Sequence, residues 1–186
     1  MRKKLNLSNE YVIGNIGRIS EQKNPIFLIN VFNEISKNNP NVKLLWVGDG
    51  EMMDEVKKHA EELGIIKNII FTGRVSNPED YYNVIDLFAM PSFYEGFPIA
   101  AIEAQTNDLT CLLSNKITNK SIITNKTKLL DIEEKMEWVS EIKKQMKLKN
   151  TRNNNFEIMQ KKGYDINTTI ELISNIYNEI LNDNGK

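Results

Sequence analysis

The sequence predicts a single doubly wound α/β domain of the Rossmann-like type, in which a mostly parallel sheet is flanked by helices. Short apolar runs alternate with amphipathic stretches through the first half of the chain, and this alternation is typical of β-α units. Each strand-like run is followed by a glycine-containing turn. A chain of 186 residues can bury one proper core but is too short for two comparable domains.

Apolar runs predict five strands, at residues 11–16, 42–47, 68–72, 86–90 and 109–113. The stretches between them predict helices at residues 25–37, 51–63, 78–84 and 97–106. Pro25 suits a first helical turn with Asn24 as its N-cap, and Gly64 suits the C-terminal end of the second helix. Strand and helix therefore alternate from residue 11 to residue 113.

The pattern weakens after residue 113. Residues 114–130 are rich in Asn, Lys, Ser and Thr, which indicates an irregular segment with at most a short strand near 128–130. Helices are predicted again within about 132–182, at residues 132–146 and 166–181, with 156–162 as a further helical candidate and 150–155 as a polar linker. We treat residues 1–186 as one domain.

Composition excludes several classes of function. Lys and Arg total 24 against 25 Asp and Glu, so the chain lacks the positive field that holds nucleic acid, and no nucleic-acid partner is expected. The basic opening is not followed by an apolar signal region, and no apolar run reaches membrane-spanning length, so the expected location is the cytoplasm. Cys111 is the only cysteine and lies in an apolar run, which indicates a buried structural thiol.

Two glutamates bracket the start of a predicted helix. Glu95 and Glu103 are separated by seven residues, and Pro98 between them suits the first helical position. Glu103 then lies one to two turns inside the helix, and every other residue from Phe97 to Ala104 is apolar or Pro, so its carboxylate needs a partner to offset desolvation. A ligand hydroxyl is one such partner, and phosphate groups bind well at helix N-termini. By helix propensity alone an exposed helical glutamate is the favoured reading of Glu103, and the Glu95 partner with its flanking Gly-Phe-Pro reduces the weight of that reading.

Two cations follow the first predicted strand. Arg18 comes directly after it and Lys23 lies five positions on, in a loop where Gly17 lets the backbone approach a ligand closely. Two cations in one loop could meet a diphosphate. Their spacing alone would favour a pair of solvent-facing surface cations, and the nearby glutamate motif reverses that preference.

These motifs, together with residues 47–51 and 70–73, resemble the C-terminal, donor-binding half of glycosyltransferase family 4 (glycosyl transferases group 1). Members of that family are retaining nucleotide-sugar transferases of GT-B architecture. The likeness spans most of the chain and rests on segments in the family's order, at residues 17–24, 47–51, 70–73, 90–98 and 102–105. It implies that residues 1–186 form one nucleotide-sugar-binding domain, the C-terminal half of a GT-B fold, with the N-terminal acceptor domain absent.

The resemblance implies three catalytic residues. Arg18 and Lys23 would stabilise the leaving diphosphate, and Glu95 would contact the hydroxyls of the donor sugar. Glu103 would accept hydrogen bonds from the ribose diol. The implied donor-binding set is Gly17, Gly73, Val75, Gly96, Phe97, Ile99, Ala100 and Glu103.

Backbone groups complete the implied site. The N–H groups of Phe97, Ile99 and Ala100 would cradle a phosphate with the help of the helix dipole. Backbone groups in the loop around Gly73 and Val75 would hold the base, which leaves uridine and guanosine both open. The implied site has no metal and no cofactor other than the nucleotide-sugar substrate.

The implied function is donor binding within a hexosyl-transferring enzyme of surface polysaccharide synthesis. The donor would be a UDP-sugar or GDP-sugar and the acceptor a glycan or a lipid-linked glycan. A separate N-terminal acceptor domain is the expected partner, and the chain alone is expected to be inactive in transfer. The alternative is a truncated or vestigial nucleotide-binding module without transfer activity. A sugar-nucleotide epimerase is a poorer third reading, because the glutamate spacing and the short chain disfavour it.

Several conspicuous residues favour structural explanations. The Gly48-Asp49-Gly50 run lacks the Lys-Ser/Thr of a P-loop and predicts a strand-to-helix turn that borders the site. His59, the only histidine, lies among charged residues and is expected at the surface. Trp46 and Trp138 fit the core.

Two further features concern the second half of the chain. Asp108 stands where the family usually has Gly, in a left-handed position that Asp tolerates at some cost. A basic cluster could touch the inner face of an anionic membrane, although a solvated face is the favoured reading. Its members are Lys143, Lys144, Lys147, Lys149 and Arg152.

Overall fold

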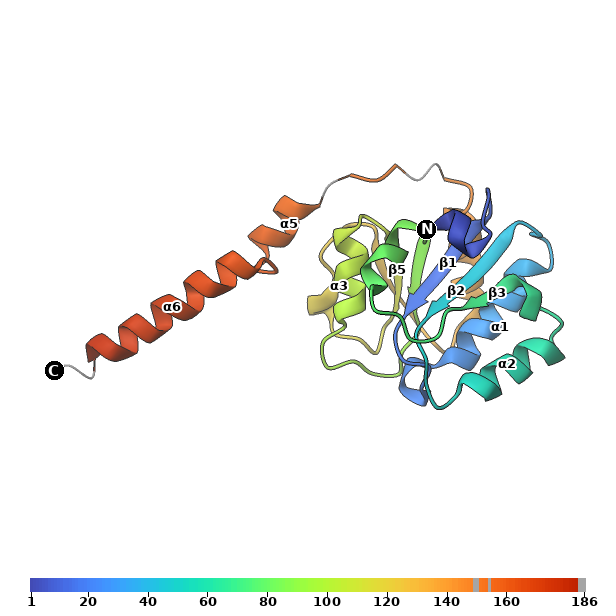
Figure 1. Cartoon of the computed structure of the whole chain (residues 1–186), viewed down its shortest axis with the longest axis horizontal. Coiled ribbons are helices and arrows are strands. Elements are labelled where there is room, and N and C mark those ends of the chain that lie inside the picture. Colours follow the sequence, from blue (N-terminus) through green and yellow to red (C-terminus); the bar gives the residue numbers. More distant parts are fainter. Residues whose placement is uncertain (149–150, 154, 184–186) are drawn as a thin grey trace.

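The computed structural model describes residues 1–148, 151–153 and 155–183. Its centre is a six-stranded sheet with the order β3-β2-β1-β4-β5-β6, and every neighbouring pair of strands is parallel (Figure 1). The strands are β1 Tyr11–Ile16, β2 Val42–Val47, β3 Ile69–Phe71, β4 Leu87–Met90, β5 Thr110–Ser114 and β6 Thr127–Leu130. This arrangement confirms the predicted doubly wound α/β class.

Helices connect the strands and continue beyond the sheet. They are α1 Pro25–Ser36, α2 Met53–Glu62, α3 Ile99–Thr106, α4 Lys135–Gln145, α5 Phe156–Lys161 and α6 Ile166–Asp183. Short 3-10 helices are η1 Arg2–Leu5, η2 Glu21–Lys23, η3 Ile66–Asn68, η4 Pro78–Asn83 and η5 Asn119–Ser121. The short helix predicted at 78–84 is therefore a 3-10 segment.

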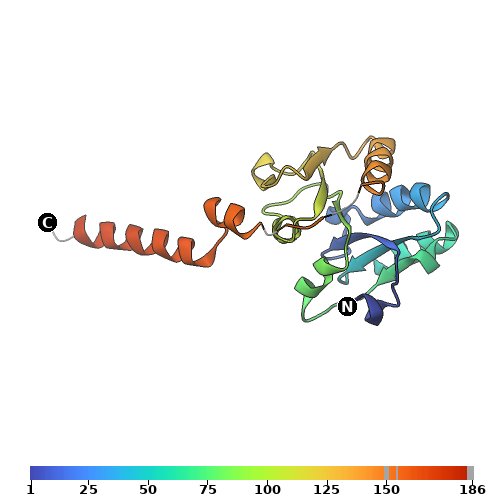
Figure 2. The ribbon, with the colours of Figure 1, turned by 90° about the horizontal axis from the view of Figure 1, so that it is seen from above.

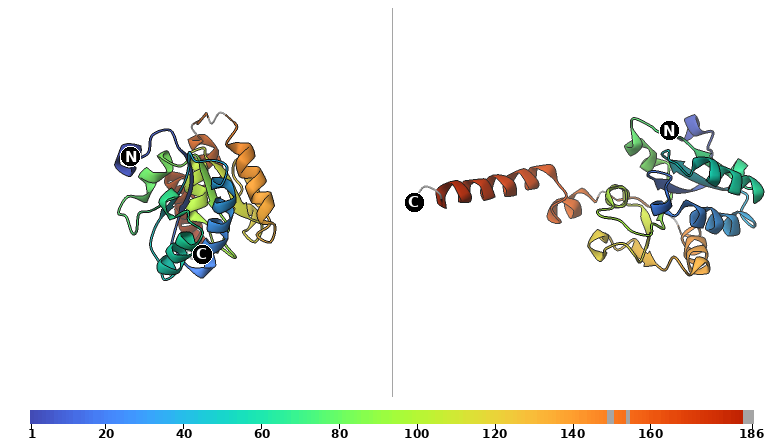
Figure 3. Two further views of the ribbon diagram at one scale, coloured as in Figure 1. Left: turned by 90° about the vertical axis from the view of Figure 1, so that its right-hand side faces the viewer. Right: turned by 90° about the horizontal axis from the view of Figure 1, so that it is seen from below.

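Two apolar cores lie on opposite faces of the sheet. On one face, α1 contacts α2 and α4, and the core includes Phe32, Trp46 and Trp138. On the other face, η4 and α3 bury side chains such as Tyr82 and Ala101 against the strands. Figure 3 (left) shows α1 and α4 on one side of the strands and η4 on the other. Both tryptophans are fully buried, which confirms the prediction that they belong to the core.

The predicted capping hydrogen bond at the start of α1 does not form. Pro25 is the first residue of α1, as predicted, but the side chain of Asn24 makes no capping hydrogen bond. Asn24 instead has a left-handed backbone with φ 52°, because it also ends η2. Asn tolerates this conformation better than most residues.

The segment predicted as irregular is organised by one side chain. Gln105 of α3 is completely buried, and its Oε1 accepts hydrogen bonds from the N–H groups of Ile123 and Thr124 and from the hydroxyl of Thr127. Its Nε2 donates to the Ser121 carbonyl oxygen at 2.7 Å. The strand expected near 128–130 is β6, which pairs along its length with β5.

Asp108 joins three separate segments. It follows α3 with φ 55°, and the hydrogen bonds from Asp108 N to Gln105 O and from Leu109 N to Ala104 O form a Schellman end. Its carboxylate accepts hydrogen bonds from Lys126 Nζ at 2.6 Å, Asn153 N at 2.6 Å and Asn155 Nδ2 at 3.0 Å. The left-handed Asp is thus compensated by contacts that glycine could not make.

The last two helices lead away from the α/β body. In Figures 1 and 2, α5 and α6 extend to one side of the sheet. An aromatic stack of Phe97 on Tyr164, with ring centroids 6.0 Å apart, joins this extension to the loop before α3. Exposed apolar side chains lie along α6, at Ile166, Ile170, Leu172, Ile173, Ile176, Tyr177, Ile180 and Leu181. Within the described ranges, no helix combines the length and apolar character needed to cross a bilayer.

Replacing Asp108 tests this junction. Burial by itself would raise the pKa of the Asp108 carboxyl, but the hydrogen bonds from Lys126, Asn153 and Asn155 outweigh it and hold the pKa below its ordinary value. Asp108→Asn keeps the left-handed preference and removes the charge. We expect it to lower the free energy of unfolding at pH 7 by about 2 kcal/mol, measured by chemical denaturation.

The pH dependence has a definite sign. A carboxylate with a lowered folded-state pKa stabilises the fold above its unfolded value of about 3.9, and this stabilisation is lost as the pH falls through the folded value. The difference between wild type and Asp108→Asn should therefore shrink below about pH 4. A difference that stayed constant from pH 7 to pH 3 would show that the charge of Asp108 contributes nothing.

Candidate functional site

The predicted site residues gather at the carboxyl edge of the sheet. In the order β3-β2-β1-β4-β5-β6, the direction of winding reverses between β1 and β4. Loops that leave neighbouring strands in opposite directions open a crevice at such a point, and ligands of open α/β sheets bind there. The loop after β1 carries Arg18 and Lys23, and the loop after β4 carries Glu95.

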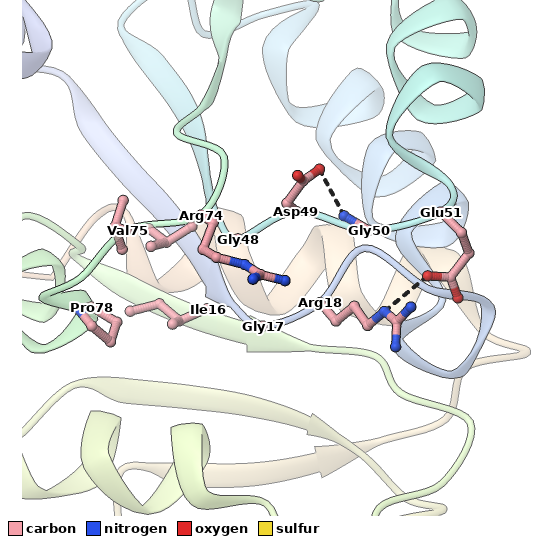
Figure 4. Close-up of a pocket in the computed structure, with 11 residues that line it drawn as sticks. Ile16, Gly17, Arg18, Gly48, Asp49, Gly50, Glu51, Arg74, Val75 and Pro78 are labelled. Atoms are coloured by element: carbon pink, nitrogen blue, oxygen red, sulfur yellow. Dashed lines mark hydrogen bonds and ion pairs between the residues drawn. The ribbon is translucent and has the colours of Figure 1, made fainter.

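A hollow of about 620 Å³ lies where the loops after β1, β2 and β3 meet (Figure 4). Arg18 lines it and is 72% exposed, with Nε 3.0 Å from Glu51 Oε2. Arg74 reaches across the hollow from the loop after β3 (Figure 4). Both guanidinium groups are exposed, so an anion could reach them without breaking a buried contact.

Two glycines allow the three loops to pack. A Cβ on Gly48 would lie 2.2 Å from the Gly17 carbonyl oxygen, and a Cβ on Gly50 would lie 2.2 Å from the Ile19 carbonyl oxygen. The Gly48 N–H donates to the Gly73 carbonyl at 3.1 Å, while the Trp46 indole donates to the Gly17 carbonyl at 3.0 Å. The predicted strand-to-helix turn is confirmed, and it forms one wall of the hollow.

A buried ion pair spans the crevice between β1 and β4. Lys23 Nζ lies 2.6 Å from Glu95 Oε1, and the two side chains are only 16% and 6% exposed. Gln22 supports the loop that carries Glu95. Its Nε2 donates to the Tyr94 carbonyl at 2.9 Å, and its backbone carbonyl accepts a hydrogen bond from Phe93 N. Residues 72 positions apart in the sequence are therefore held in direct contact.

The glutamate helix begins one residue later than its proline suggested. Pro98 has ψ 72° and is the N-cap of α3, whereas the sequence predicted it at the first helical position. The Ile99 N–H donates to the Phe97 carbonyl at 2.9 Å. Within the described part of the chain, the N–H groups of Phe97 and Ala100 have no acceptor. Two of the three expected phosphate donors are thus free, and the third is occupied.

Glu103 lies on the outer face of α3. Its helical neighbours Ile102 and Ala104 are buried, as expected, but the expectation that the Glu103 carboxylate is desolvated is wrong, because Glu103 is exposed. Its Oε2 nevertheless has a buried partner, the hydroxyl of Tyr82, which donates at 2.6 Å. An eight-residue helix can turn one polar position outward between apolar ones, because successive side chains are rotated by about 100°.

The structure divides the predicted residues into neighbouring groups. Gly17, Arg18 and Val75 line the hollow, and Gly73 is bonded to its wall through Gly48. Lys23 and Glu95 form the ion pair. The remaining predicted donor-binding residues lie at or before the start of α3 or one turn into it, namely Gly96, Phe97, Ile99, Ala100 and Glu103.

The sequence reasoning missed four polar side chains at this edge. Arg74 follows Gly73 directly, and Glu51 follows the Gly48–Gly50 turn, so their positions after strands were available signals. Gln22 and Tyr82 lie in 3-10 segments and carry no pattern that identifies their contacts.

Three other expectations concern charged or thiol groups. His59 is half-buried and its Nε2 lies 2.7 Å from Asn30 Oδ1 of α1, so it is a contact between helices and not a free surface residue. Cys111 is fully buried, as predicted. In the residues that the structure describes, no group of three or more His, Cys, Asp or Glu could hold a metal ion.

The basic cluster does not form one solvated face. Arg152 turns inward and donates hydrogen bonds to the carbonyl oxygens of Tyr82 and Ile85. Lys144 and Lys147 are exposed, and Lys149 lies outside the described residues.

Comparisons with known proteins identify related sequences and related folds. The family model for glycosyl transferases group 1 matches residues 1–162. The capsular polysaccharide biosynthesis glycosyltransferase CapH of Staphylococcus aureus is 32% identical over 169 residues, which cover 87% of this chain and 46% of CapH. The chain spans less than half the length of the curated relatives that it matches.

Two solved structures share the fold. The C-terminal domain of the group 1 glycosyltransferase LpcC from Francisella tularensis superposes with a TM-score of 0.74 at 20% identity, covering 88% of this chain and 91% of that domain. HepE of Anabaena, solved with UDP and glucose, gives a TM-score of 0.69 at 22% identity, covering 78% of this chain and 41% of HepE.

A double-mutant cycle tests the ion pair. Lys23→Met leaves a carboxylate that is 6% exposed without its cation, and Glu95→Gln leaves an ammonium that is 16% exposed without its anion. Because an uncompensated buried charge is costly, we expect each variant to lower the free energy of unfolding by about 3 kcal/mol. The double variant should lose clearly less than the sum of the two, measured by chemical denaturation.

The matched control is an exposed ion pair. Lys58 lies 4.0 Å from Glu62 with both side chains well exposed, so Lys58→Met should change stability by less than about 0.5 kcal/mol. Additive losses for Lys23 and Glu95 would show that the two charges do not interact.

Proposed function

This chain belongs to the glycosyl transferases group 1 family, and we propose that it is the nucleotide-sugar donor-binding domain of a retaining, hexosyl-transferring enzyme of glycosyltransferase family 4. The enzyme would transfer a sugar to a glycan or lipid-linked acceptor in surface polysaccharide synthesis. The relative CapH, a glycosyltransferase of capsular polysaccharide biosynthesis, supports this process.

The observation that carries the proposal is the Lys23–Glu95 contact at the switch point between β1 and β4. The pair presents a phosphate-binding cation and a sugar-binding carboxylate 2.6 Å apart, at the place where a donor's phosphate and sugar would meet. Neither group needs to travel far to exchange its partner for a ligand. Donor binding would then replace one buried ion pair by contacts from each partner to the ligand.

Arg18 and Lys23 have different tasks in this proposal. Lys23 is fixed in the crevice, where low water access strengthens its attraction to phosphate. Arg18 is exposed, and among the described residues Glu51 alone holds it, so it can turn from that carboxylate to the diphosphate. As the sugar–phosphate bond breaks, negative charge grows on the leaving diphosphate, and both cations stabilise it. The free N–H groups of Phe97 and Ala100 add donors from the start of α3.

The nucleoside end would occupy the other groups. Glu103 would accept hydrogen bonds from the vicinal hydroxyls of the ribose. The backbone near Gly73 and Val75, at the wall of the hollow, would hold the base. UDP is the favoured nucleotide over GDP, because HepE, which shares the fold, was solved with UDP.

Transfer would require an acceptor domain. The relatives are more than twice as long as the part of them that this chain covers. We therefore propose that a further domain supplies the acceptor site and that the chain alone binds donor without transfer. The proposed location is cytoplasmic, where exposed lysines of α4 such as Lys144 could contact the inner face of the membrane. No observation favours the vestigial module.

Titration calorimetry with UDP and GDP tests the donor site. A few charge-assisted contacts without a second domain should give UDP a dissociation constant of roughly 10 μM to 1 mM. Arg18→Ala should weaken UDP binding about tenfold. The residue is exposed, so the fold should not change.

Lys58→Ala is the control, since it removes an exposed cation with a similar carboxylate neighbour on α2, away from the switch point. It should leave UDP binding unchanged. A folded chain that binds neither nucleotide, or an Arg18→Ala variant that binds UDP as tightly as wild type, would contradict the assigned site.

A further inference from the structure

The hydroxyl of Tyr82 lies under the carboxylate of Glu103. It donates to Glu103 Oε2 at 2.6 Å and lies 3.2 Å from the Ala100 carbonyl oxygen, one turn earlier in α3. Tyr82 is only 1% exposed, so this hydroxyl is the polar tip of a core side chain. Glu103 itself is exposed. A rigid buried donor thus meets an exposed acceptor at the helix that begins the proposed donor site.

Tyr82 is fixed from several sides. Its ring packs on Phe88 of β4, with centroids 6.2 Å apart. Its backbone carbonyl accepts a hydrogen bond from the Arg152 guanidinium at 3.0 Å. Because η4 is clamped at this residue, the hydroxyl has a defined position relative to the sheet, and any side chain bound to it inherits that position.

The hydrogen bond has one direction. Burial, and then the contact with Glu103, raise the pKa of Tyr82 far above its ordinary value. The hydroxyl therefore remains protonated at working pH and can donate to the carboxylate. Oε1, the second carboxylate oxygen, has no partner among the described residues. One oxygen is thus held and the other is left for a ligand.

We propose that Tyr82 is a positioning residue that orients the Glu103 carboxylate toward the vicinal diol of the donor's ribose. This inference rests on the proposed function. It adds the residue that makes an exposed helical glutamate specific for a ribose diol. A free glutamate side chain loses rotamer freedom when it binds a ligand, and a preformed hydrogen bond removes part of that cost in advance.

A purely structural role would give a different result. If Tyr82 only stabilised the packing of η4, its hydroxyl would affect all ligands of the site equally or none. If it positions Glu103, its loss should matter only for ligands that carry both ribose hydroxyls. The ligand pair UDP and 2′-deoxy-UDP separates the two roles, because they differ in one hydroxyl of the diol.

The experiment is titration calorimetry of the 186-residue chain and its variants with both nucleotides. Tyr82→Phe should weaken UDP binding about three- to tenfold, the range expected for one hydrogen bond, and change 2′-deoxy-UDP binding by less than about twofold. In a Glu103→Gln background, Tyr82→Phe should have little further effect on UDP.

The control is Tyr81→Phe. Tyr81 is the neighbouring buried tyrosine of η4, and its hydroxyl has no hydrogen bond among the described residues. This variant should bind both nucleotides like wild type. If Tyr82→Phe fails to fold by circular dichroism, Glu103→Asp serves instead, because its shorter side chain keeps the charge but withdraws the carboxylate from the hydroxyl. It should show the same preference for weakening UDP.

The outcomes separate the two proposals. Wild-type binding of UDP with equal effects of Tyr82→Phe on both nucleotides, or with no effect, would overturn the positioning role and leave the donor site standing. No binding of UDP by the folded wild-type chain would overturn the proposed function and this inference together.

Discussion

The pairing of β1 with β4 is the constraint on which the rest of the structure depends. It places the reversal of the sheet between these strands, so that the loops after them face each other across a crevice. Lys23 comes from one loop and Glu95 from the other, and their buried contact joins the two loops across the crevice. A charge pair that is buried mainly for stability has little advantage over apolar packing. Under the proposed function the pair would separate around a charged ligand, and that would explain why charged groups occupy this position.

The second half of the chain stabilises the C-terminal end of α3, which is the end away from the candidate site, and also stabilises η4. Asp108, Gln105 and Arg152 act as polar junctions that fasten residues 121–127, 151–153 and 155 to α3 and η4. These contacts replace the regular packing that the sequence lacks there. They also fix the carbonyl of Tyr82 and the C-terminal end of α3, which are the supports of Glu103. Segments without obvious function thus determine the geometry of a residue in the candidate site.

The sequence predicted the fold well because the patterns that define strands and helices are local in the chain. The runs Tyr11–Ile16 and Val42–Val47 are strands with the predicted bounds, since short runs dominated by apolar residues suit buried parallel strands. The strand at Thr127–Leu130 was harder to define, because its pairing with β5 depends on Gln105, a residue more than twenty positions away. The predicted position of Pro98 was one residue off for a local reason. Proline has a fixed φ but a free ψ, so it fits an N-cap as well as a first helical turn.

The site was predictable only as a set of residue types at strand ends. That Arg18 and Lys23 would occupy different environments, one exposed and one buried, follows from the position of Glu95 in space and not from their spacing. The partner of Glu103 could not be found either, because Tyr82 is one of two adjacent tyrosines and only the three-dimensional packing selects it.

The most direct test of the account is to follow the backbone amide resonances of the nitrogen-15-labelled chain while UDP is added. If the nucleotide binds at the switch point, the largest shifts should fall on the loops after β1, β3 and β4, with Gly17, Gly73, Phe97 and Ala100 among them. Shifts confined to the far face, for example around α2 and α4, or no shifts at saturating UDP, would contradict it.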